Sequence, residues 1–272
     1  DELEKKIEER TIEYKKAKED AEQANHLKSE FLANMSHELH TPMHHILSFA
    51  QIGIRRFNTA KDKTLDSFEK IISASNRMMV LINNLLDLSE LESGRVDYQM
   101  EKTELADIIK NLINEFSSII DGKSIYLELK KPKYSTIVMC DDIKISQVLR
   151  NLISNALKFT SPNQSIIISF KQQKLPEGKG QTDNDMIPAL TLRIKDKGIG
   201  IPENELESVF DKFVQSSKTN TGAGGTGLGL AICKKIIQAH KGKIWAENNT
   251  EGGATFSFLL PYEQKEPVIE KR

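Results

Sequence analysis

The sequence predicts a multi-domain chain in which an α-helical hairpin, preceded by a coiled coil, is followed by an α/β sandwich. Two observations support this. Up to about residue 95, apolar residues recur in steps of three and four, the spacing of amphipathic helices. From Thr103 onward, helical stretches alternate with short strand-like runs, which favours helices packed on one face of a mixed sheet.

The first predicted element is a coiled-coil signalling helix over residues 1–28. Its seam follows a heptad spacing through Leu3, Ile7, Arg10, Tyr14, Ala17, Ala21, Ala24 and Lys28. The two basic residues and the small alanines make this a weak seam, so a single long solvated helix is the alternative. The pattern continues without a breaker into the next element.

Residues 29–95 are predicted to form a helical hairpin. Its second helix has an apolar stripe made of Leu65, Phe68, Ile72, Ser75, Met79, Ile82, Leu86 and Ser89. Gly94 is a plausible stop signal for this helix. One hairpin cannot bury both of its apolar faces, so we expect two copies to pair as a dimeric four-helix bundle.

The remaining chain is divided into a linker (96–102), an α/β domain (103–262) and a charged tail (263–272). Helices are predicted over 104–119, 141–158 and 226–240. Strands are predicted over 125–129, 166–170, 190–194, 243–246 and 255–260. The polar stretch 172–185 between two of these strands is expected to be a disordered extension of a hairpin.

Composition narrows the class of protein. With 38 Lys and Arg against 39 Asp and Glu in 272 residues, the chain lacks the basic field of a nucleic-acid binder. No apolar run approaches the roughly 20 residues of a membrane span, and no signal peptide is evident. Cys140 and Cys233 lack metal or disulfide spacing, which favours reduced thiols in the cytoplasm. Because the chain begins at Asp1 within a helical pattern, we expect a fragment of a longer protein, whose full-length form could be membrane-anchored.

A histidine-rich segment, Ser36–Pro42, is the first candidate site. His37 is a potential nucleophile, Glu38 is its neighbour, and Thr41 shares its helical face. His40 and His44 lie on the same face, with His45 beside them, so a metal site is one alternative and a solvated helix face is the other. A metalloprotease HExxH site is excluded, because Thr41 occupies the place of the second histidine.

Four later segments have the residues of a nucleotide site. In Asn151–Phe159, the two amide oxygens of Asn151 and Asn155 suit a hard cation, while Lys158 suits phosphate and the aromatic ring suits a base. Asp196 starts a turn with Gly198 and Gly200, where its carboxylate can accept a hydrogen bond from an exocyclic amine. Each segment can also be interpreted as an ordinary helix or turn that binds no ligand.

The third segment, Phe210–Phe213, offers a basic and aromatic pocket edge, or packing with a solvated lysine. The fourth, Gly222–Leu230, is rich in glycine and opens a helix, where main-chain N–H groups favour phosphate. It lacks the Lys-Ser/Thr ending of a P-loop. A dinucleotide fold is disfavoured, because these glycines come late and do not follow a first strand.

In order and content, these segments resemble the boxes of sensor histidine kinases of two-component systems. The histidine segment is similar to their H box, and the four later segments are similar to their N, G1, F and G2 boxes. Gly252–Phe256 resembles their final glycine motif. The resemblance covers roughly Lys28 to Pro261, and it implies an ATP-binding domain of the Bergerat (GHKL) type.

The resemblance implies a protein histidine kinase that uses ATP and Mg²⁺. His37 would be the phosphoacceptor, with Glu38 as its proton partner and Thr41 serving a reverse phosphatase reaction. The phosphoryl group would pass to an aspartate of a response regulator. Asn155 and Asn151 would hold Mg²⁺, and Gln215–Gly227 would be a mobile lid. The implied ATP contacts are Asn151, Asn155, Lys158, Phe159, Asp196, Gly198, Gly200, Lys212, Phe213, Gly225, Thr226, Gly227, Leu228, Gly229 and Thr255.

Two other functions are kept open. A pseudokinase scaffold would bind ATP only to set the conformation of the bundle, although intact His37, Glu38, Asn155 and Asp196 argue against it. An ATPase related to topoisomerases and chaperones would lack the histidine hairpin. One residue departs from the family pattern: His40 stands where the family usually carries arginine, which puts the ionic contact of that arginine in doubt.

Overall fold

The computed structural model describes residues 6, 10, 11, 14, 15, 18, 35, 36, 38–57, 61–94, 96–176, 186–218 and 226–263. The chain divides into two compact units, Asp1–Asn83 and Asn84–Arg272. The described residues before residue 20 are helical, but most of the predicted coiled-coil seam lies outside the described residues.

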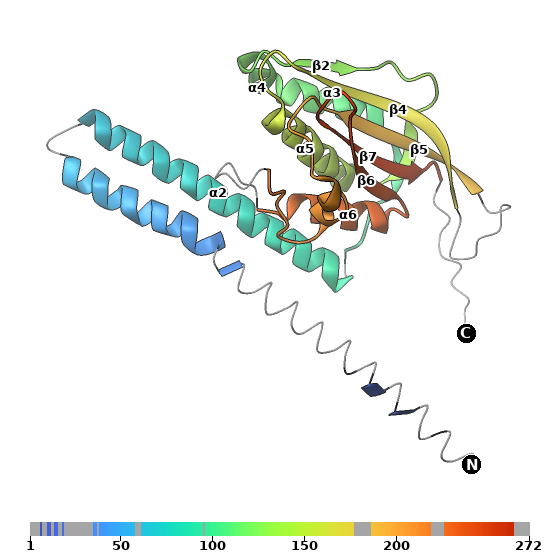
Figure 1. The fold of residues 1–272 in the computed structure, drawn as a ribbon, viewed down its shortest axis with the longest axis horizontal. Coiled ribbons are helices and arrows are strands. Elements are labelled where there is room, and N and C mark those ends of the chain that lie inside the picture. The colour runs from blue at the N-terminus through green and yellow to red at the C-terminus, as the bar shows by residue number, and fades with distance from the viewer. Residues whose placement is uncertain are drawn as a thin grey trace. The chain divides into compact units, whose positions relative to one another are not determined.

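The first unit contains the predicted helical hairpin. One helix covers residues 38–56, and α2 (Lys61–Ser93) runs beside it before its last turns enter the second unit (Figure 1). The helices approach closely at Gly53, where an added Cβ would lie 3.5 Å from the Cβ of Ser67. The Nζ of Lys70 lies 5.3 Å from the ring centroid of Phe49. The hairpin prediction is therefore confirmed.

One face of this hairpin is apolar and uncovered. On α2, the side chains of Leu65, Ile72 and Met79 are 62%, 60% and 56% exposed. On the other helix, Leu47 is 56% exposed and Ile54 is 77% exposed. Among the described residues, this part of the amphipathic stripe predicted from the sequence is therefore exposed. Within the part of the chain that the structure describes, no helix is both long and apolar enough to cross a bilayer.

The second unit is built on a five-stranded sheet in the order β2-β4-β5-β7-β6. Its strands are β2 (Tyr126–Leu129), β4 (Ser165–Pro176), β5 (Met186–Lys195), β6 (Lys243–Asn248) and β7 (Ala254–Pro261). Only β2 and β4 pair in parallel, and the other neighbours are antiparallel. The sheet is mixed, as predicted.

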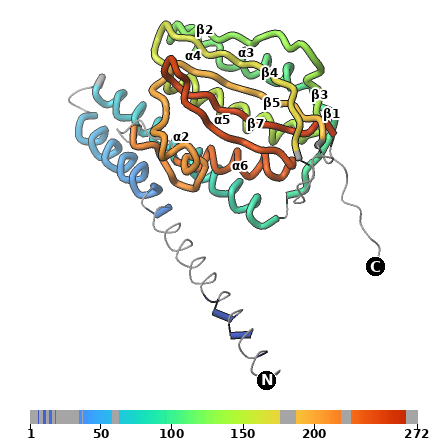
Figure 2. The backbone as a smooth tube through the Cα atoms, turned by 45° about the vertical axis from the view of Figure 1, so that its right-hand side comes forward, coloured from blue at the N-terminus to red at the C-terminus, as the bar shows by residue number. Residues whose placement is uncertain are grey.

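Helices cover one face of this sheet (Figure 2). They are α3 (Leu105–Glu115), the short α4 (Ser117–Gly122), α5 (Asp142–Phe159) and α6 (Gly229–Ala239). α5 packs against α3, α6 and β5, and α6 also contacts β6 and β7. Leu149, Ile153 and Ile236 on the helices are fully buried, as are Leu192 and Phe258 on the sheet. This apolar layer fixes the positions of α5 and α6, which carry most of the predicted site.

Several predicted boundaries were wrong. The strands β1 (Glu101–Glu104) and β3 (Ile137–Cys140) form an antiparallel pair that was not predicted, because each is too short to give a clear alternation. The helix predicted over 104–119 divides into α3 and α4. β4 extends into the stretch that was expected to be disordered, and β5 begins at Met186, ahead of the predicted strand, so that Leu175 pairs with Ile187. The polar composition of this stretch does not predict the pairing of β4 with β5, since the end of a hairpin can be polar on both faces.

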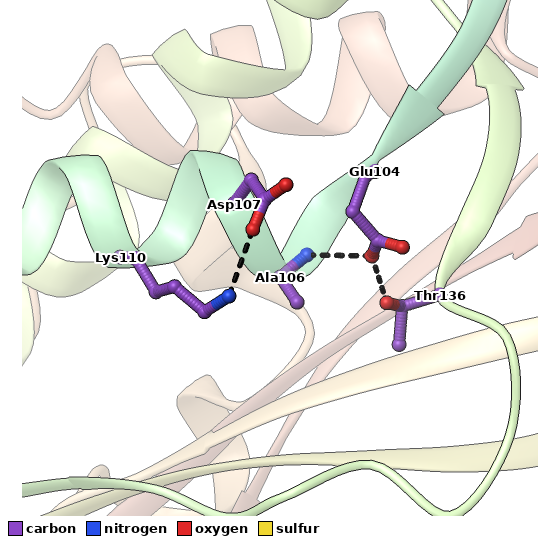
Figure 3. Close-up of polar contacts among 5 residues, drawn as sticks. All are labelled: Glu104, Ala106, Asp107, Lys110 and Thr136. Carbon is purple, nitrogen blue, oxygen red and sulfur yellow. Dashed lines mark hydrogen bonds and ion pairs between the residues drawn. The ribbon is translucent and has the colours of Figure 1, made fainter.

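α3 begins at a side-chain cap that also ties it to the loop before β3. The Oε1 of Glu104 accepts hydrogen bonds from the Ala106 N–H, at 3.2 Å, and from the Thr136 hydroxyl (Figure 3). On the first turn, the Lys110 Nζ lies 2.8 Å from Asp107. The capping carboxylate satisfies a helix N–H that has no partner within the helix.

His240 at the end of α6 is buried and joins three segments. Its Nδ1 lies 2.8 Å from the Ile236 carbonyl, and its Nε2 lies 3.0 Å from the Asp141 N–H. A carbonyl only accepts and an N–H only donates, so the proton must be on Nδ1 and the ring is neutral. Asp141 also caps α5 through Lys144 N–H and accepts from Gln99 N–H, while Tyr98 meets the ring edge-on. Burial lowers the pKa of His240.

The lowered pKa of His240 predicts that acid destabilises the second unit. The unfolded chain takes up this proton near its ordinary pKa of 6.5, whereas the folded chain does so only at lower pH, so stability present above that value is lost as pH falls. Between about pH 7.5 and about pH 5.5, we expect His240→Gln to remove roughly 1 kcal/mol of the acid-induced loss of unfolding free energy. Urea titrations followed by the single tryptophan, Trp245 on β6, measure it. The exposed His45→Gln is the control, and equal pH slopes in wild type and His240→Gln would contradict the prediction.

Candidate nucleotide site

The asparagine segment lies on the side of α5 next to its buried face. Val148, Leu152 and Ala156 point into the interior, so Asn151 and Asn155 are left on the half-buried side of the helix. The Asn155 Nδ2 donates to the Asn151 Oδ1 at 3.1 Å. This bond turns the Asn155 oxygen away from the shared contact and makes it available as a hard oxygen ligand. The donor set therefore fits Mg²⁺, which prefers oxygen ligands.

The glycine-rich segment meets α5 at the start of α6. A Cβ added to Gly229 would lie 2.1 Å from the Asn151 Nδ2, so a larger residue there would displace the Asn151 amide. The N-cap residue Leu228 provides no side-chain cap, and the first N–H groups of a helix, which have no partner within the helix, suit an anion. The segments predicted to bind the cation and the phosphates are thus brought together.

Gly227 is required by a second close approach. Its φ of +67° is in the left-handed region, and an added Cβ would lie 2.7 Å from the Phe213 main chain. Its carbonyl accepts from the Phe213 N–H at 2.9 Å. Because of this positive φ, the helix starts later than predicted, and α6 begins at Gly229 and not at Thr226. This contact places the third predicted segment, with Lys212 and Phe213, beside the fourth.

Other residues of these two segments have partners within the second unit. Lys212 forms an ion pair with Glu92 near the end of α2. The Thr226 hydroxyl accepts from the Asn84 Nδ2, at 3.2 Å, and from the Leu228 N–H. The Leu228 side chain is fully buried, so the contact with nucleotide predicted for this residue falls to its main chain.

The end of α5 contacts the turn that follows β5. The Lys158 Nζ lies 5.0 Å from the ring centroid of Phe159, and burial lowers the pKa of Lys158. Thr160 pairs with Gly198 in a β-bridge. A Cβ at Gly198 would lie 2.7 Å from the Phe159 carbonyl oxygen, which explains the glycine there. The predicted base-binding ring and the predicted carboxylate segment are therefore adjacent.

Asp196 ends β5 with a buried carboxylate. Its Oδ1 accepts from the Gly198 N–H at 2.8 Å and from the Ala254 N–H at 3.1 Å. Burial raises the pKa of Asp196, while these two main-chain bonds act in the opposite direction. Since Oδ1 has both of these N–H partners, Oδ2 is the oxygen that the carboxylate can offer to a ligand. Gly200, with a φ of +66°, turns the chain just beyond it.

Two residues that the sequence analysis did not single out also contact this turn. Asn248 and Asn249, at the end of β6, bond to its two ends. Thr255, predicted to contact ATP, donates its hydroxyl to the Asn249 Oδ1 at 2.6 Å. Consecutive asparagines ahead of Gly252-Gly253 were the available signal. This signal is weak, because asparagine is common in any turn.

The histidine segment is only partly described. His37 and Gly225 lie outside the described residues. Glu38 and Thr41 lie on the helix over residues 38–56, and the His40 Nδ1 lies 2.7 Å from the Ser36 carbonyl. Among the residues that the structure describes, no three His, Cys, Asp or Glu side chains could together hold a metal ion. The metal alternative, which needs His37, stays untested.

Comparison with known proteins gives two family models. The His Kinase A (phospho-acceptor) domain matches residues 27–94, which include His37. The model described as histidine kinase-, DNA gyrase B- and HSP90-like ATPase matches residues 140–264. The first match overlaps the predicted histidine hairpin (29–95), and the second overlaps the later part of the predicted α/β domain (103–262).

Most of the chain is similar to named sensor kinases. The chain is 32% identical over 257 residues to the autoinducer 2 sensor kinase/phosphatase LuxQ of Vibrio vulnificus, covering 94% of this chain and 29% of LuxQ. It is 34% identical to the sensor histidine kinase WalK of Bacillus subtilis, covering 87% of this chain and 37% of WalK. It thus spans less than two fifths of either relative.

Solved structures agree with these relatives. The histidine kinase AdeS of Acinetobacter baumannii superposes with a TM-score of 0.59 at 25% identity, covering 84% of this chain and 98% of that one. The histidine kinase ThkA in complex with response regulator protein TrrA gives 0.64 at 26% identity, covering 86% and 61%. With both family models in order and a helical hairpin joined to this mixed sheet, the chain belongs to the sensor histidine kinases.

Proposed function

We propose that this chain is an ATP-dependent protein histidine kinase that phosphorylates its own His37 and passes the phosphoryl group to an aspartate of a response regulator. The observation that carries the proposal is the close approach of Gly229 to Asn151, which unites a phosphate-binding helix start with a pair of amide ligands. The relatives named as sensor kinases and the ThkA complex with a response regulator support it.

The nucleotide is assigned to the second unit. Asp196 would accept the adenine amino group through Oδ2, and the Phe159 ring would lie against the base. Lys158 would reach a phosphate. Asn151 and Asn155 would hold Mg²⁺, which neutralises charge on the phosphates when bound. The remaining ATP contacts predicted from the sequence are retained in this assignment.

Transfer would begin at the histidine hairpin. His37 Nε2 attacks the γ-phosphorus, the bond from that phosphorus to the bridging oxygen breaks, and ADP leaves with the electron pair. Glu38 orients the ring through the other nitrogen and takes up its proton. We assign Thr41 to the reverse, phosphatase reaction. The phosphoaspartate of the partner forms when His37 gives up the group.

We assign residues 29–95 to dimerisation and phosphotransfer and 103–262 to catalysis, with 1–28 as a signalling helix, 96–102 as a linker and 263–272 as a tail. A homodimer is supported by the uncovered face of the hairpin that includes Leu65, Ile72 and Met79, which a second copy of the hairpin would bury. Cytoplasmic placement is supported by the use of ATP and by the free, buried thiols of Cys140 and Cys233.

Incubation with γ-labelled ATP tests the phosphoacceptor. We expect an acid-labile, base-stable label on the wild-type chain and a fall to below about 1% of that label in His37→Gln, because glutamine has no nucleophilic ring nitrogen. His45→Gln, a change at an exposed histidine of the same helix, should label normally. Label that survives in His37→Gln would reject this residue, and a wild-type chain that binds ATP without labelling would favour the pseudokinase.

Gly229→Ala tests the site geometry. The added methyl group would meet the Asn151 amide, so we expect the dissociation constant for Mg²⁺-ADP to rise about tenfold or more while the fold persists. Calorimetric titration measures the constant. Gly122→Ala is the matched control, because nothing lies within 4 Å of the Cβ that it adds. Unchanged affinity in Gly229→Ala would count against this site.

Ile72→Glu tests dimerisation. A carboxylate on the apolar face would have to be buried without a partner, so we expect the dimer to weaken about 100-fold or more. Sedimentation over a range of concentrations measures this. Ile143→Glu, which changes an isoleucine that is 72% exposed on α5, is the control and should sediment like the wild type. A wild-type chain that stays monomeric at high concentration would overturn the assignment.

A further inference from the structure

The turn from β6 to β7 holds the Asp196 turn at both ends. Asn248 bonds to the main chain of Ile201, and Asn249 bonds to the main chain of Asp196 itself. The segment between these anchors contains Gly198 and Gly200. We call Asn248 and Asn249 the asparagine pair. Neither is assigned above to the nucleotide or to the cation.

Asn248 makes a two-way bond to one residue. Its Oδ1 accepts from the Ile201 N–H at 2.9 Å, and its Nδ2 donates to the Ile201 carbonyl at 2.6 Å. The main-chain groups can each play only one part, so the orientation of the amide is fixed. The same Nδ2 lies 3.0 Å from the Glu203 Oε1. The Asn248 amide therefore bonds to both main-chain groups of Ile201, as a neighbouring strand would.

Asn249 anchors the other end. Its Nδ2 donates to the Asp196 carbonyl oxygen at 2.8 Å, while its Oδ1 accepts from the Thr255 hydroxyl at 2.6 Å. Its own main chain closes the turn, since its N–H donates to the Gly253 carbonyl at 3.0 Å. Gly253 lies so close that a Cβ there would be 2.2 Å from the same Asp196 oxygen. The bond thus lies at a tightly packed point of the turn.

The position of the Asp196 carboxylate depends on these anchors. Two main-chain N–H groups, of Gly198 and Ala254, hold its Oδ1, and both belong to the segments that the asparagine pair joins. If the two turns moved apart, Oδ1 would lose a partner and Oδ2 would change its direction. A hydrogen bond to the base is sensitive to such a change, because it weakens steeply with angle.

We infer that Asn248 and Asn249 are positioning residues for nucleotide recognition, which aim the Asp196 carboxylate at the amino group of adenine. The inference rests on the proposed function, in which Asp196 accepts that group. It assigns part of the preference for adenine over guanine to side chains that do not touch the base. Guanine has a carbonyl oxygen where adenine has its amino group, so a well-aimed carboxylate repels it.

The sharpest test is Asn249→Asp in the full chain. The change is nearly isosteric and keeps the acceptor for Thr255, but it removes the donor and sets a second oxygen against the Asp196 carbonyl. We expect KM for ATP in autophosphorylation to rise about tenfold with kcat within about twofold, and the ratio of kcat/KM for ATP over GTP to fall about tenfold. The same chemical change at an exposed site of α3, Asn111→Asp, is the matched control and should alter neither value.

Two further variants guard against a loss of fold. Asn248→Asp loses the donor to Ile201, and Thr255→Val loses the hydroxyl that orients Asn249. Asn248→Asp should raise KM and lower the preference for ATP over GTP, while Thr255→Val, whose hydroxyl is also a predicted ATP contact, should raise KM less than Asn249→Asp does; circular dichroism should show an unchanged fold. An Asn249→Asp chain with wild-type KM and wild-type ATP preference would overturn the inference. A chain in which kcat/KM falls by the same factor for ATP and for GTP would also overturn it.

Asp196→Asn separates this inference from the proposed function on which it rests. Calorimetric binding of Mg²⁺-ADP is the readout. If Asp196→Asn abolishes binding while Asn249→Asp binds like the wild type, the adenine site stands and the role of the asparagine pair is rejected. If Asp196→Asn binds like the wild type, the adenine assignment itself is wrong. Loss in both, with the Asn111→Asp control intact, supports the inference.

Discussion

The burial of the Asp196 carboxylate is the constraint on which the nucleotide end of this fold depends. A carboxylate with 5% exposure costs free energy unless N–H groups reach it. Gly198 and Ala254 supply those groups, and they come from two turns that are far apart in the sequence. The turns must therefore be held together, and main-chain and asparagine bonds do this. The site geometry follows from satisfying one buried acceptor.

The glycines around the site follow from the same close packing. Gly229 lets the start of α6 approach Asn151, Gly227 lets it approach Phe213, and Gly253 lets β7 approach Asp196. In each case an added Cβ would come within 3 Å of another residue. Their common role is to bring main chain against neighbouring segments, so that N–H groups and amide side chains can face one ligand.

The histidine hairpin differs from the closely packed second unit, because part of its apolar surface is exposed. Its helices bury small and apolar residues such as Ala74 and Leu81 between themselves, yet Leu65, Ile72 and Met79 stay exposed. A large exposed apolar face of this kind is typical of an interaction surface. The second unit shows the contrasting outcome, since its helices bury their apolar faces against its own sheet. The second unit buries its apolar helix faces within itself, whereas the described part of the hairpin leaves one such face exposed.

The sequence by itself determined the kinds of element, the order of the motifs and the family, because helical periodicity, β-branched runs and glycine clusters are local signals. It identified Asn151 and Gly229 without showing that they meet, and Asp196 without showing which N–H groups hold it. It missed β1, β3 and the asparagine pair, and it misjudged the ends of β4, β5 and α6. Those features were decided by tertiary structure: strand pairing, a left-handed turn at Gly227 and bonds from Asn248 and Asn249 to a distant loop arise only when segments remote in the chain pack together.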